Sequence, residues 1–276
     1  MIFIISINIM VKIFTMVKGE VDIVKDWVLY HGNLFGFKNL YIIDNYSKDG
    51  TFELLQQLTS QYKINVCRLP DYKKKGEYMT SLIKIFSQNE FSFPIDIDEF
   101  IVHYDKQTNS INCDNETIYN NIKRLPIAPA YKMNYIFANP DNVDGYNRAT
   151  IECKNGKYSD YGSAAKTFFH SSLFNGKIDH GNHYHTTNYY LSNFCLVHYH
   201  CRNLEQMKKK IFNNVSGLGH SPFNLSYLKT IEKGNPDGIH HIRNQIQILE
   251  NTFNLPIDIH SDISLGPLIN KILSLS

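Results

Sequence analysis

Apolar segments alternate with helical patterns over residues 11–100, and this alternation limits the fold more than any other feature of the chain. VKIFTMV (11–17) has the composition of a strand buried on both faces, and apolar residues then recur at helical spacing over 20–36. NLYIID (39–44) predicts a second buried strand, followed by a polar turn and a helix over 51–62. Strands that alternate with helices pair in parallel through right-handed crossovers, so we expect an open, mostly parallel α/β sheet with flanking helices.

The alternation continues with a short strand at 64–68, a helix at 77–88 and a fourth strand, FSFPIDID (91–98), which carries acids at its carboxyl end. Ligands on open α/β sheets bind at the carboxyl ends of the strands. The polar residues expected at those ends are Lys18, Glu20, Asp44, Asn45, Asp96 and Asp98. We therefore predict a ligand site along this edge of the sheet.

Periodicity weakens in the second half, where the pattern predicts shorter elements. These are a polar stretch (103–116), a helix near 116–124, strand-like pieces at 130–137, 148–153 and 164–170, a His-rich loop (180–188), a strand at 194–200, a basic helix at about 203–215 and an amphipathic helix at roughly 238–253. No internal repeat or low-complexity linker is visible, so we do not expect a second domain. Residues 1–9 precede a second plausible start, Met10, and are interpreted as a candidate upstream extension.

Composition excludes several classes of protein. A net charge of +2, with basic runs limited to 73–75 and 208–210, does not indicate a nucleic-acid partner, and we interpret these lysines as solvated faces. The five cysteines are odd in number and form no C-x-x-C, so we expect no disulfide framework and a cytoplasmic location, free or at a membrane surface. Lys12 interrupts the apolar start too early for a transmembrane segment.

Two carboxylates close the fourth predicted strand, since Asp96 and Asp98 lie at i and i+2 in DIDEF (96–100). If the strand is still extended there, both side chains point the same way. Two hard oxygen donors so placed suit Mn²⁺ or Mg²⁺, with a diphosphate supplying further oxygens. A solvated acidic pair is the ordinary alternative, but these acids are embedded in apolar sequence, and buried acids are usually paired or metal-bound. We therefore predict metal binding by Asp96 and Asp98.

Asp44 ends the second predicted strand, where a carboxylate can accept hydrogen bonds from a nucleotide base or ribose. Aspartate also begins turns readily, and the two roles are compatible. No G-x-G-x-x-G or G-x-x-x-x-G-K-[ST] loop is present in the sequence. A metal, not a glycine-rich loop, would therefore have to neutralise any bound phosphates.

Histidines gather late in the chain, at His170, His180, His183, His185, His198 and His200. The pairs 183/185 and 198/200 have the i, i+2 spacing that faces one way on a strand. We expect one of these imidazoles to complete the metal shell or contact a diphosphate, and take His198 as the third metal ligand. Lys166 and Arg202 are candidate phosphate partners, with a surface charge as the alternative for each.

Three segments together resemble a known family. MVKGEVDIVKDWVLYHGNLFGFKNLYIIDNYSKDGTFELL (16–55), with its Trp and Tyr-His on the first helix, resembles the opening of the glycosyltransferase family 2-like and family 92-like enzymes. DIDEF is similar to the D-x-D-E-F metal motif of that group, and LVHYHCRNLEQMKKK (196–210) to its later H-Y segment and basic helix. Two positions depart from the pattern, Gly19 where it has Asn and Phe93 where many members have Trp.

The resemblance implies a GT-A fold, the nucleotide-diphospho-sugar transferase fold, over 11–230, with a nucleotide half (11–100), an acceptor half (101–230) and a helical tail (231–276). It implies a UDP-type nucleotide-sugar donor and a glycan, protein or lipid acceptor. Mn²⁺ or Mg²⁺ would bridge the diphosphate to Asp98. The other residues that it would place at the donor are Asp96 near the ribose or metal, Asp44 at the base, and Lys18 and Glu20 in the nucleotide pocket. From their places in the sequence we also expect Asn45 and Lys166 at the donor site.

The resemblance also implies hexosyl transfer with inversion at C1, in which a carboxylate removes the proton of the attacking hydroxyl. Asp160, Asp179 and Glu99 are the candidates for this base. One rival interpretation is a metal-dependent hydrolase that uses the late histidines with Asp96 and Asp98, although no H-E-x-x-H signature is present. The other is a catalytically inactive carbohydrate-binding relative.

Overall fold

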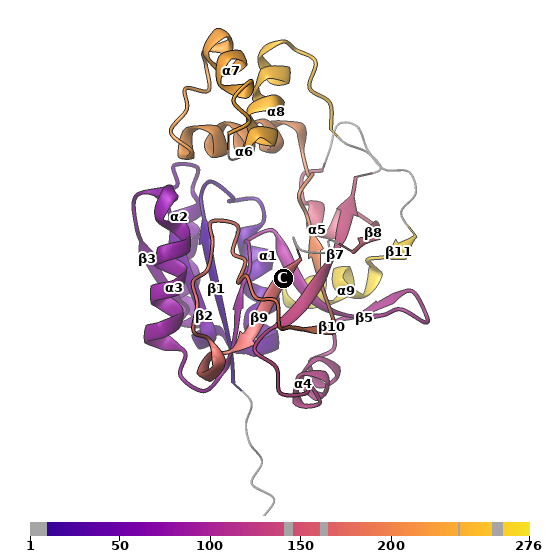
Figure 1. Cartoon of the computed structure of the whole chain (residues 1–276). Coiled ribbons are helices and arrows are strands. Elements are labelled where there is room, and N and C mark those ends of the chain that lie inside the picture. The colour runs from indigo at the N-terminus through magenta and orange to yellow at the C-terminus, as the bar shows by residue number, and fades with distance from the viewer. Residues whose placement is uncertain (1–9, 141–145, 161–164, 237, 256–261) are drawn as a thin grey trace, which may run out of the picture.

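The computed structural model describes residues 10–140, 146–160, 165–236, 238–255 and 262–276, so the extension expected at 1–9 lies outside the described residues. Parallel strands in the order β3-β2-β1-β4 form one half of the sheet. They are β1 (Val11–Val17), β2 (Leu40–Asp44), β3 (Asn65–Arg68) and β4 (Phe91–Pro94). Helices lie between these strands in the chain and flank the sheet (Figure 1), so the predicted α/β class is confirmed.

Both faces of this half-sheet are covered, which explains why its strands carry few polar residues. Ile13 of β1 lies in the core cluster that includes residues of α1 (Val24–Phe35) and α2 (Thr51–Tyr62). The next residue, Phe14, lies in the other cluster, with residues of α3 (Lys75–Phe86). Alternate residues of β1 therefore face different helices.

The sheet continues from β4 into a mixed half in the order β9-β7-β10-β5-β6, with β8 paired to β7 and β11 paired to β8. These strands are β5 (Glu99–Asp105), β6 (Ser110–Asn112), β7 (Tyr131–Asn139), β8 (Asn155–Ser159), β9 (Lys166–His170), β10 (Tyr190–His198) and β11 (Ile263–Ser264). In the antiparallel ladder of β5 and β10, Glu99 pairs with His198. The end of β10 therefore lies beside the DIDEF segment.

Helix α1 is tied to β5 by polar side chains that are otherwise enclosed in the core. Trp27 Nε1 donates to the carbonyl oxygen of Glu99 at 3.0 Å, and the Tyr30 hydroxyl donates to that of Ile101 at 2.6 Å. His31 Nε2 lies 3.3 Å from the Ile101 N–H, and its Nδ1 lies 3.0 Å from the Trp27 carbonyl. Nε2 must therefore accept and Nδ1 must carry the proton.

The remaining helices of the described chain are α4 (Asn115–Lys123), α5 (Ala149–Glu152), α6 (Leu204–Gly217), α7 (Leu225–Glu232), α8 (Ile239–Leu249) and α9 (Gly266–Leu275), with short 3₁₀ helices at Phe37–Asn39, Tyr72–Lys74 and Ser171–Leu173. The expectation of a strand at 148–153 is wrong. That segment is α5, and the Glu152 carboxylate accepts the Arg148 N–H at 2.6 Å to close its single turn. The polar stretch 103–116 contains the β5–β6 hairpin and the start of α4.

Helices α6, α7 and α8 form a cap over the carboxyl ends of the strands (Figure 1). The cap has an apolar cluster of its own, made by Val215, Leu228, Ile242 and Ile246. Asn203 and Asn224 cap α6 and α7 by accepting backbone N–H groups of the first turn. In contrast, α9 packs against α1 and α5 and contributes Leu268 to the main core.

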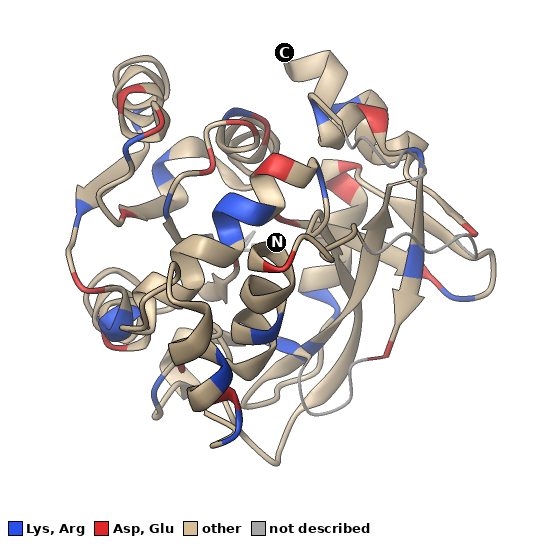
Figure 2. Cartoon of the chain, turned by 90° about the horizontal axis from the view of Figure 1, so that it is seen from above, with Lys and Arg blue, Asp and Glu red and all other residues tan. Residues whose placement is uncertain are grey.

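Among the described residues, no helix combines the length and the apolar composition that a membrane crossing requires. Seen from the side of the cap, basic and acidic residues are interspersed over the helices and loops (Figure 2). The described cysteines are all free thiols, as expected from their number and spacing.

Candidate active site

A cavity of about 840 Å³ lies between the carboxyl ends of the strands and the cap. Its walls come from the loop after β1, the turn after β4, β9, the end of β10, and the cap helices α6 and α8. The strand order reverses at β1, which has β2 on one side and β4 on the other, and open α/β sheets bind ligands at such a point. The volume is in the range of small-molecule sites. The predicted edge of the sheet thus carries a cavity of ligand size.

Strand β4 ends at Pro94, earlier than the predicted end at residue 98. The chain then turns, because the Glu99 carboxylate accepts the Asp96 N–H at 2.7 Å and the Glu99 N–H donates to the Asp96 carbonyl at 3.1 Å. The condition for two parallel carboxylates, an extended strand through 98, is therefore not met. Asp96 and Asp98 bind separate sets of partners.

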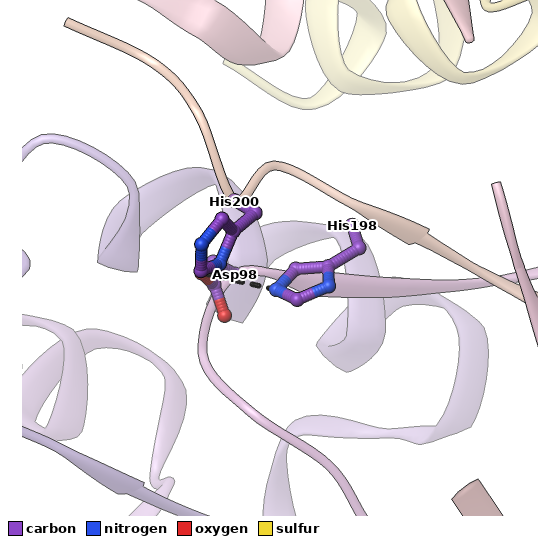
Figure 3. Close-up of side chains that lie close together, drawn as sticks. All are labelled: Asp98, His198 and His200. Carbon is purple, nitrogen blue, oxygen red and sulfur yellow. Dashed lines mark ion pairs between the residues drawn. The ribbon is translucent and has the colours of Figure 1, made fainter. Parts of the chain in front are cut away.

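Asp98, His198 and His200 form a group whose candidate ligand atoms all lie within 4.8 Å of one another (Figure 3). His198 Nε2 lies 3.4 Å from Asp98 Oδ2. The β5–β10 register creates this proximity, since Glu99 pairs with His198 and the Tyr199 N–H donates to the Asp98 carbonyl at 2.9 Å. His200 comes from the segment that follows β10, so the i, i+2 pair expected from the sequence converges on one of the two predicted acids.

The donor set of this group fits a divalent metal. One carboxylate oxygen and two imidazole nitrogens are ligands that Mn²⁺ and Zn²⁺ accept, and an imidazole must be neutral to ligate. Burial, together with the charge of Lys210, lowers the pKa of His200 well below its ordinary value, so this ring is neutral at physiological pH. Burial raises the pKa of Asp98, but Lys210 and His198 outweigh it and hold that pKa well below the ordinary value. His198 Nδ1 is buried without a hydrogen-bond partner among the described residues.

Asp96 is held by cations of the protein itself. Lys75 Nζ lies 2.8 Å from its Oδ1, Lys166 Nζ lies 2.6 Å from its Oδ2, and Asn182 Nδ2 donates to Oδ1 at 2.8 Å. Lys166 also donates to Glu99 at 2.9 Å and is almost fully buried. Lys166 lies in the cavity wall as a partner of carboxylates, and its contact with a phosphate stays a prediction, while Asp96 lies outside the three-residue group.

The interpretation of both basic runs as solvated faces is wrong at Lys75 and Lys210. Lys75 is buried at the start of α3 and pairs with Asp96, and Lys210 lines the cavity and pairs with Asp98. Helical spacing was the available signal, because Lys210 lies three residues after Met207 and next to Ile211, on the buried face of α6.

The loop after β1 supplies Lys18 and Glu20, which both line the cavity. The Glu20 carboxylate accepts a hydrogen bond from Arg202 Nη2, and both side chains are buried, so Arg202 is an internal partner and not a surface charge. Gly19 between them has a φ of 71°. Glycine adopts this left-handed conformation without strain, and asparagine tolerates it better than most other residues.

Asp44 and Asn45 lie outside the cavity wall. The Asp44 side chain is 0% exposed and accepts from the Ser47 N–H at 3.2 Å and from Arg68 Nε at 2.8 Å. Asn45 Nδ2 donates to the Leu69 carbonyl at 2.9 Å. Both residues thus stabilise the turn after β2, and contact with a nucleotide base stays a prediction for each.

The three base candidates occupy different places. Asp160 is exposed, after β8. Asp179 lies beside the cavity loop and accepts from the His183 N–H at 2.7 Å, with His185 Nε2 at 2.8 Å. Glu99 lines the cavity, and its buried Oε1 has no hydrogen-bond partner among the described residues. Of these three carboxylates, Glu99 is the one placed to meet a ligand.

A scan of protein-family models and a search of curated proteins gave no match to this chain. Among solved structures, the crystal structure of S. aureus TarS 1-349 aligns with a TM-score of 0.44 at 10% sequence identity, over 88% of this chain and 71% of the other. The crystal structure of the same protein in complex with UDP-GlcNAc aligns with a TM-score of 0.45 at 11% identity, over 88% of this chain and 72% of the other.

Proposed function

We propose that this protein is a GT-A-type glycosyltransferase that transfers a sugar from a nucleotide-sugar, in the first instance a UDP-sugar, to an acceptor hydroxyl with inversion at C1. The observation that carries the proposal is the group Asp98, His198 and His200 in the wall of a ligand-sized cavity at the carboxyl ends of parallel strands. These are also the segments, DIDEF and the later H-Y segment, on which the family resemblance depends.

Asp98, His198 and His200 would hold Mn²⁺, which when bound supplies Lewis-acid stabilisation of the leaving diphosphate, whereas the two imidazoles disfavour the Mg²⁺ also expected from the sequence. Lys18 lines the same cavity and offers an ammonium to the phosphates. Asp96 is left to orient Lys75 and Lys166, which it holds at 2.8 and 2.6 Å. In this assignment Asp96 is a positioning residue and the metal-binding role belongs to Asp98.

Glu99 is the proposed base for the acceptor hydroxyl. Its Oε2 is occupied by Lys166 at 2.9 Å and by the Asp96 N–H at 2.7 Å, which fixes the carboxylate and leaves Oε1 for a ligand proton. A buried acceptor without a donor costs about 1–3 kcal/mol, so a ligand hydroxyl that supplies the donor is favoured there. Direct attack by that hydroxyl on C1 produces inversion.

The test is a thermal-shift panel of UDP, GDP and CMP compounds, each with and without Mn²⁺, followed by an assay for nucleotide release from the stabilising sugar donor. A ligand at 100 times its Kd should stabilise the protein by roughly 2.7 kcal/mol. We expect a shift with a uridine nucleotide that requires Mn²⁺ and disappears in Asp98→Ala. Equal shifts in Asp98→Ala, or no metal-dependent shift with any nucleotide, would remove the proposal.

A metal-dependent hydrolase is the second candidate, because two histidines and one carboxylate are also the ligand set of zinc hydrolases. It predicts that tightly bound zinc co-purifies with the protein and that UDP-sugars give no thermal shift. The panel above separates the two functions, since the transferase requires stabilisation by the nucleotide. An inactive carbohydrate-binding relative would bind without releasing nucleotide.

A further inference from the structure

Lys210 occupies the oxygen of Asp98 that a metal would use. Its ammonium donates to Asp98 Oδ2, and the same oxygen lies 3.4 Å from His198 Nε2. The Lys210 side chain is 18% exposed, so the pair is largely removed from water. Because Asp98 Oδ2 faces both the ammonium and the imidazole, a metal bound between Asp98 and His198 would compete with the ammonium for this oxygen.

The ammonium has a clear role when no metal is bound. A buried carboxylate without a counter-ion is strongly destabilising, and the side chains that group with Asp98 are imidazoles, whereas the Lys210 ammonium donates directly to Asp98 Oδ2. Arg202 is engaged by Glu20. Lys210 is thus the cation that neutralises Asp98 in the metal-free protein.

A divalent ion at Asp98 would repel the ammonium and take its place. Lysine has a flexible stem of four carbons and can move without a change in its helix. Since Lys210 lines the cavity, its ammonium can move from Asp98 into the space that the phosphates of a nucleotide would fill. Those phosphates carry the negative charge that the displaced ammonium needs.

We propose that Lys210 exchanges partners, neutralising Asp98 when the metal is absent and binding a phosphate oxygen of the nucleotide when the metal is present. The exchange rests on the proposed function, because it requires both a metal and a nucleotide in this cavity. It makes their binding cooperative, since metal alone must displace an ammonium whose other neighbouring carboxylate, Glu20, is already paired with Arg202. By linkage, each ligand raises the affinity for the other by the same factor.

The experiment measures the Kd of Mn²⁺ alone, and the Kd of UDP at saturating Mn²⁺, by isothermal titration calorimetry. In Lys210→Met the competitor for Asp98 is gone, so Mn²⁺ alone should bind about ten-fold more tightly, or better. UDP should bind about ten-fold more weakly, because the phosphate has lost its cation. A ten-fold change corresponds to 1.4 kcal/mol, which is ordinary for one charged hydrogen bond.

Lys209→Met is the matched control. Lys209 is adjacent on α6, carries the same charge and pairs with Asp49 at 2.6 Å, and it is not among the residues that line the cavity. Both affinities should stay within two-fold of the wild type in this variant. Lys210→Arg is a second test, in which the affinity for Mn²⁺ alone should change in the opposite direction. A guanidinium can bind the carboxylate through two donors, so Mn²⁺ alone should bind more weakly.

Opposite shifts of the two affinities in Lys210→Met support the exchange. If the wild type binds Mn²⁺ and UDP but Lys210→Met binds Mn²⁺ with equal or lower affinity, the exchange is overturned and the proposed function stands. If neither the wild type nor Lys210→Met binds Mn²⁺ or UDP, both are overturned. Binding of Mn²⁺ by Lys210→Met alone, with none by the wild type, would support the competition directly.

Discussion

Trp27 donates from its indole nitrogen to the carbonyl oxygen of Glu99, 3.0 Å away, and thereby joins helix α1 to the first residue of β5. Tyr30 and His31 extend this connection to Ile101. Because Glu99 pairs with His198 across the β5–β10 ladder, the same bonds fix Asp98 relative to the histidines. Residues of the first helix therefore support the candidate metal group without touching it.

Replacing Trp27 with Phe should lower the free energy of unfolding by about 2 kcal/mol or more, because a buried carbonyl loses its donor and a cavity replaces part of the indole. Urea denaturation measures the change. Mn²⁺ affinity should fall as well, since the start of β5 is less fixed. Tyr189→Phe, on an exposed ring, should leave both quantities near wild type. A Trp27→Phe protein of wild-type stability would mean that the bond to Glu99 contributes nothing.

Local patterns were sufficient for the first half of the chain. The predicted strand over 11–17 and the helix over 51–62 match β1 and α2, because each is a continuous run of one periodicity with clear turn residues at its ends. The fourth strand is shorter than its pattern predicts, because the Glu99 carboxylate accepts the Asp96 N–H and closes a turn there. Periodicity does not reveal a hydrogen bond of this kind. The helix at 149–152 spans a single turn, too short for any period to appear.

The candidate site was predictable only in part. Asp98 and His198 were identified from motif and spacing, but their meeting depends on the register of two strands far apart in the sequence. The pairing of Lys75 with Asp96, and of Lys210 with Asp98, required the packing of α3 and α6. A long side chain on a partly buried helix can face water or a carboxylate, and the sequence near it does not decide which.

His31 should make the protein acid-sensitive. Burial lowers its pKa to about 3, from about 6.5 in the unfolded chain, so below pH 6.5 the unfolded state takes up a proton that the folded state excludes. The contribution of neutral His31 to the free energy of unfolding is therefore fully present above pH 6.5 and is lost as the pH falls towards 3. Between pH 7 and 5 the loss should be about 2 kcal/mol. Denaturation of the wild type and of His31→Gln at both pH values isolates the contribution of His31. The difference between their free energies of unfolding should be smaller at pH 5 than at pH 7 by this amount. A constant gap would contradict the assignment.

Replacing either His198 or His200 with Ala should weaken Mn²⁺ binding by at least about ten-fold, since each removes one of three candidate ligands. Titration calorimetry with Mn²⁺ reports the loss directly. His185→Ala is the control, because that ring is exposed and pairs with Asp179 at 2.8 Å, outside the metal group. Loss of Mn²⁺ affinity in His185→Ala but not in His198→Ala would instead assign the metal site to the His-rich loop (180–188).

Asp44→Ala should reduce stability by about 2 kcal/mol, because the Ser47 N–H and Arg68 Nε lose a buried acceptor. UDP affinity in the presence of Mn²⁺, measured below the melting temperature, should change less than two-fold if Asp44 serves only the turn. A ten-fold loss of UDP affinity would instead support the role at the nucleotide base that the family resemblance implies.

Glu99→Gln should lower kcat by roughly 10²-fold or more, the contribution expected of a general base, with a smaller change in KM for the donor. Asp160→Asn and Asp179→Asn serve as comparisons, since neither carboxylate is in the cavity wall. Thermal melting of each variant separates loss of the base from loss of the fold. A large loss of kcat in one of those two variants, with Glu99→Gln active, would reassign the base.

The cap has an apolar cluster of its own, made by Val215, Leu228, Ile242 and Ile246. This separation determines which walls of the cavity can change independently of the sheet. The residues that hold α6, α7 and α8 together are different from those that hold the sheet, so replacements on the cavity-facing surface of the cap leave the Asp98 group in place. Substitutions on that surface should therefore change which molecules enter the cavity without replacing the Asp98 group. A graft of α6–α8 from another chain, with Lys210 retained, is the natural way to change selectivity.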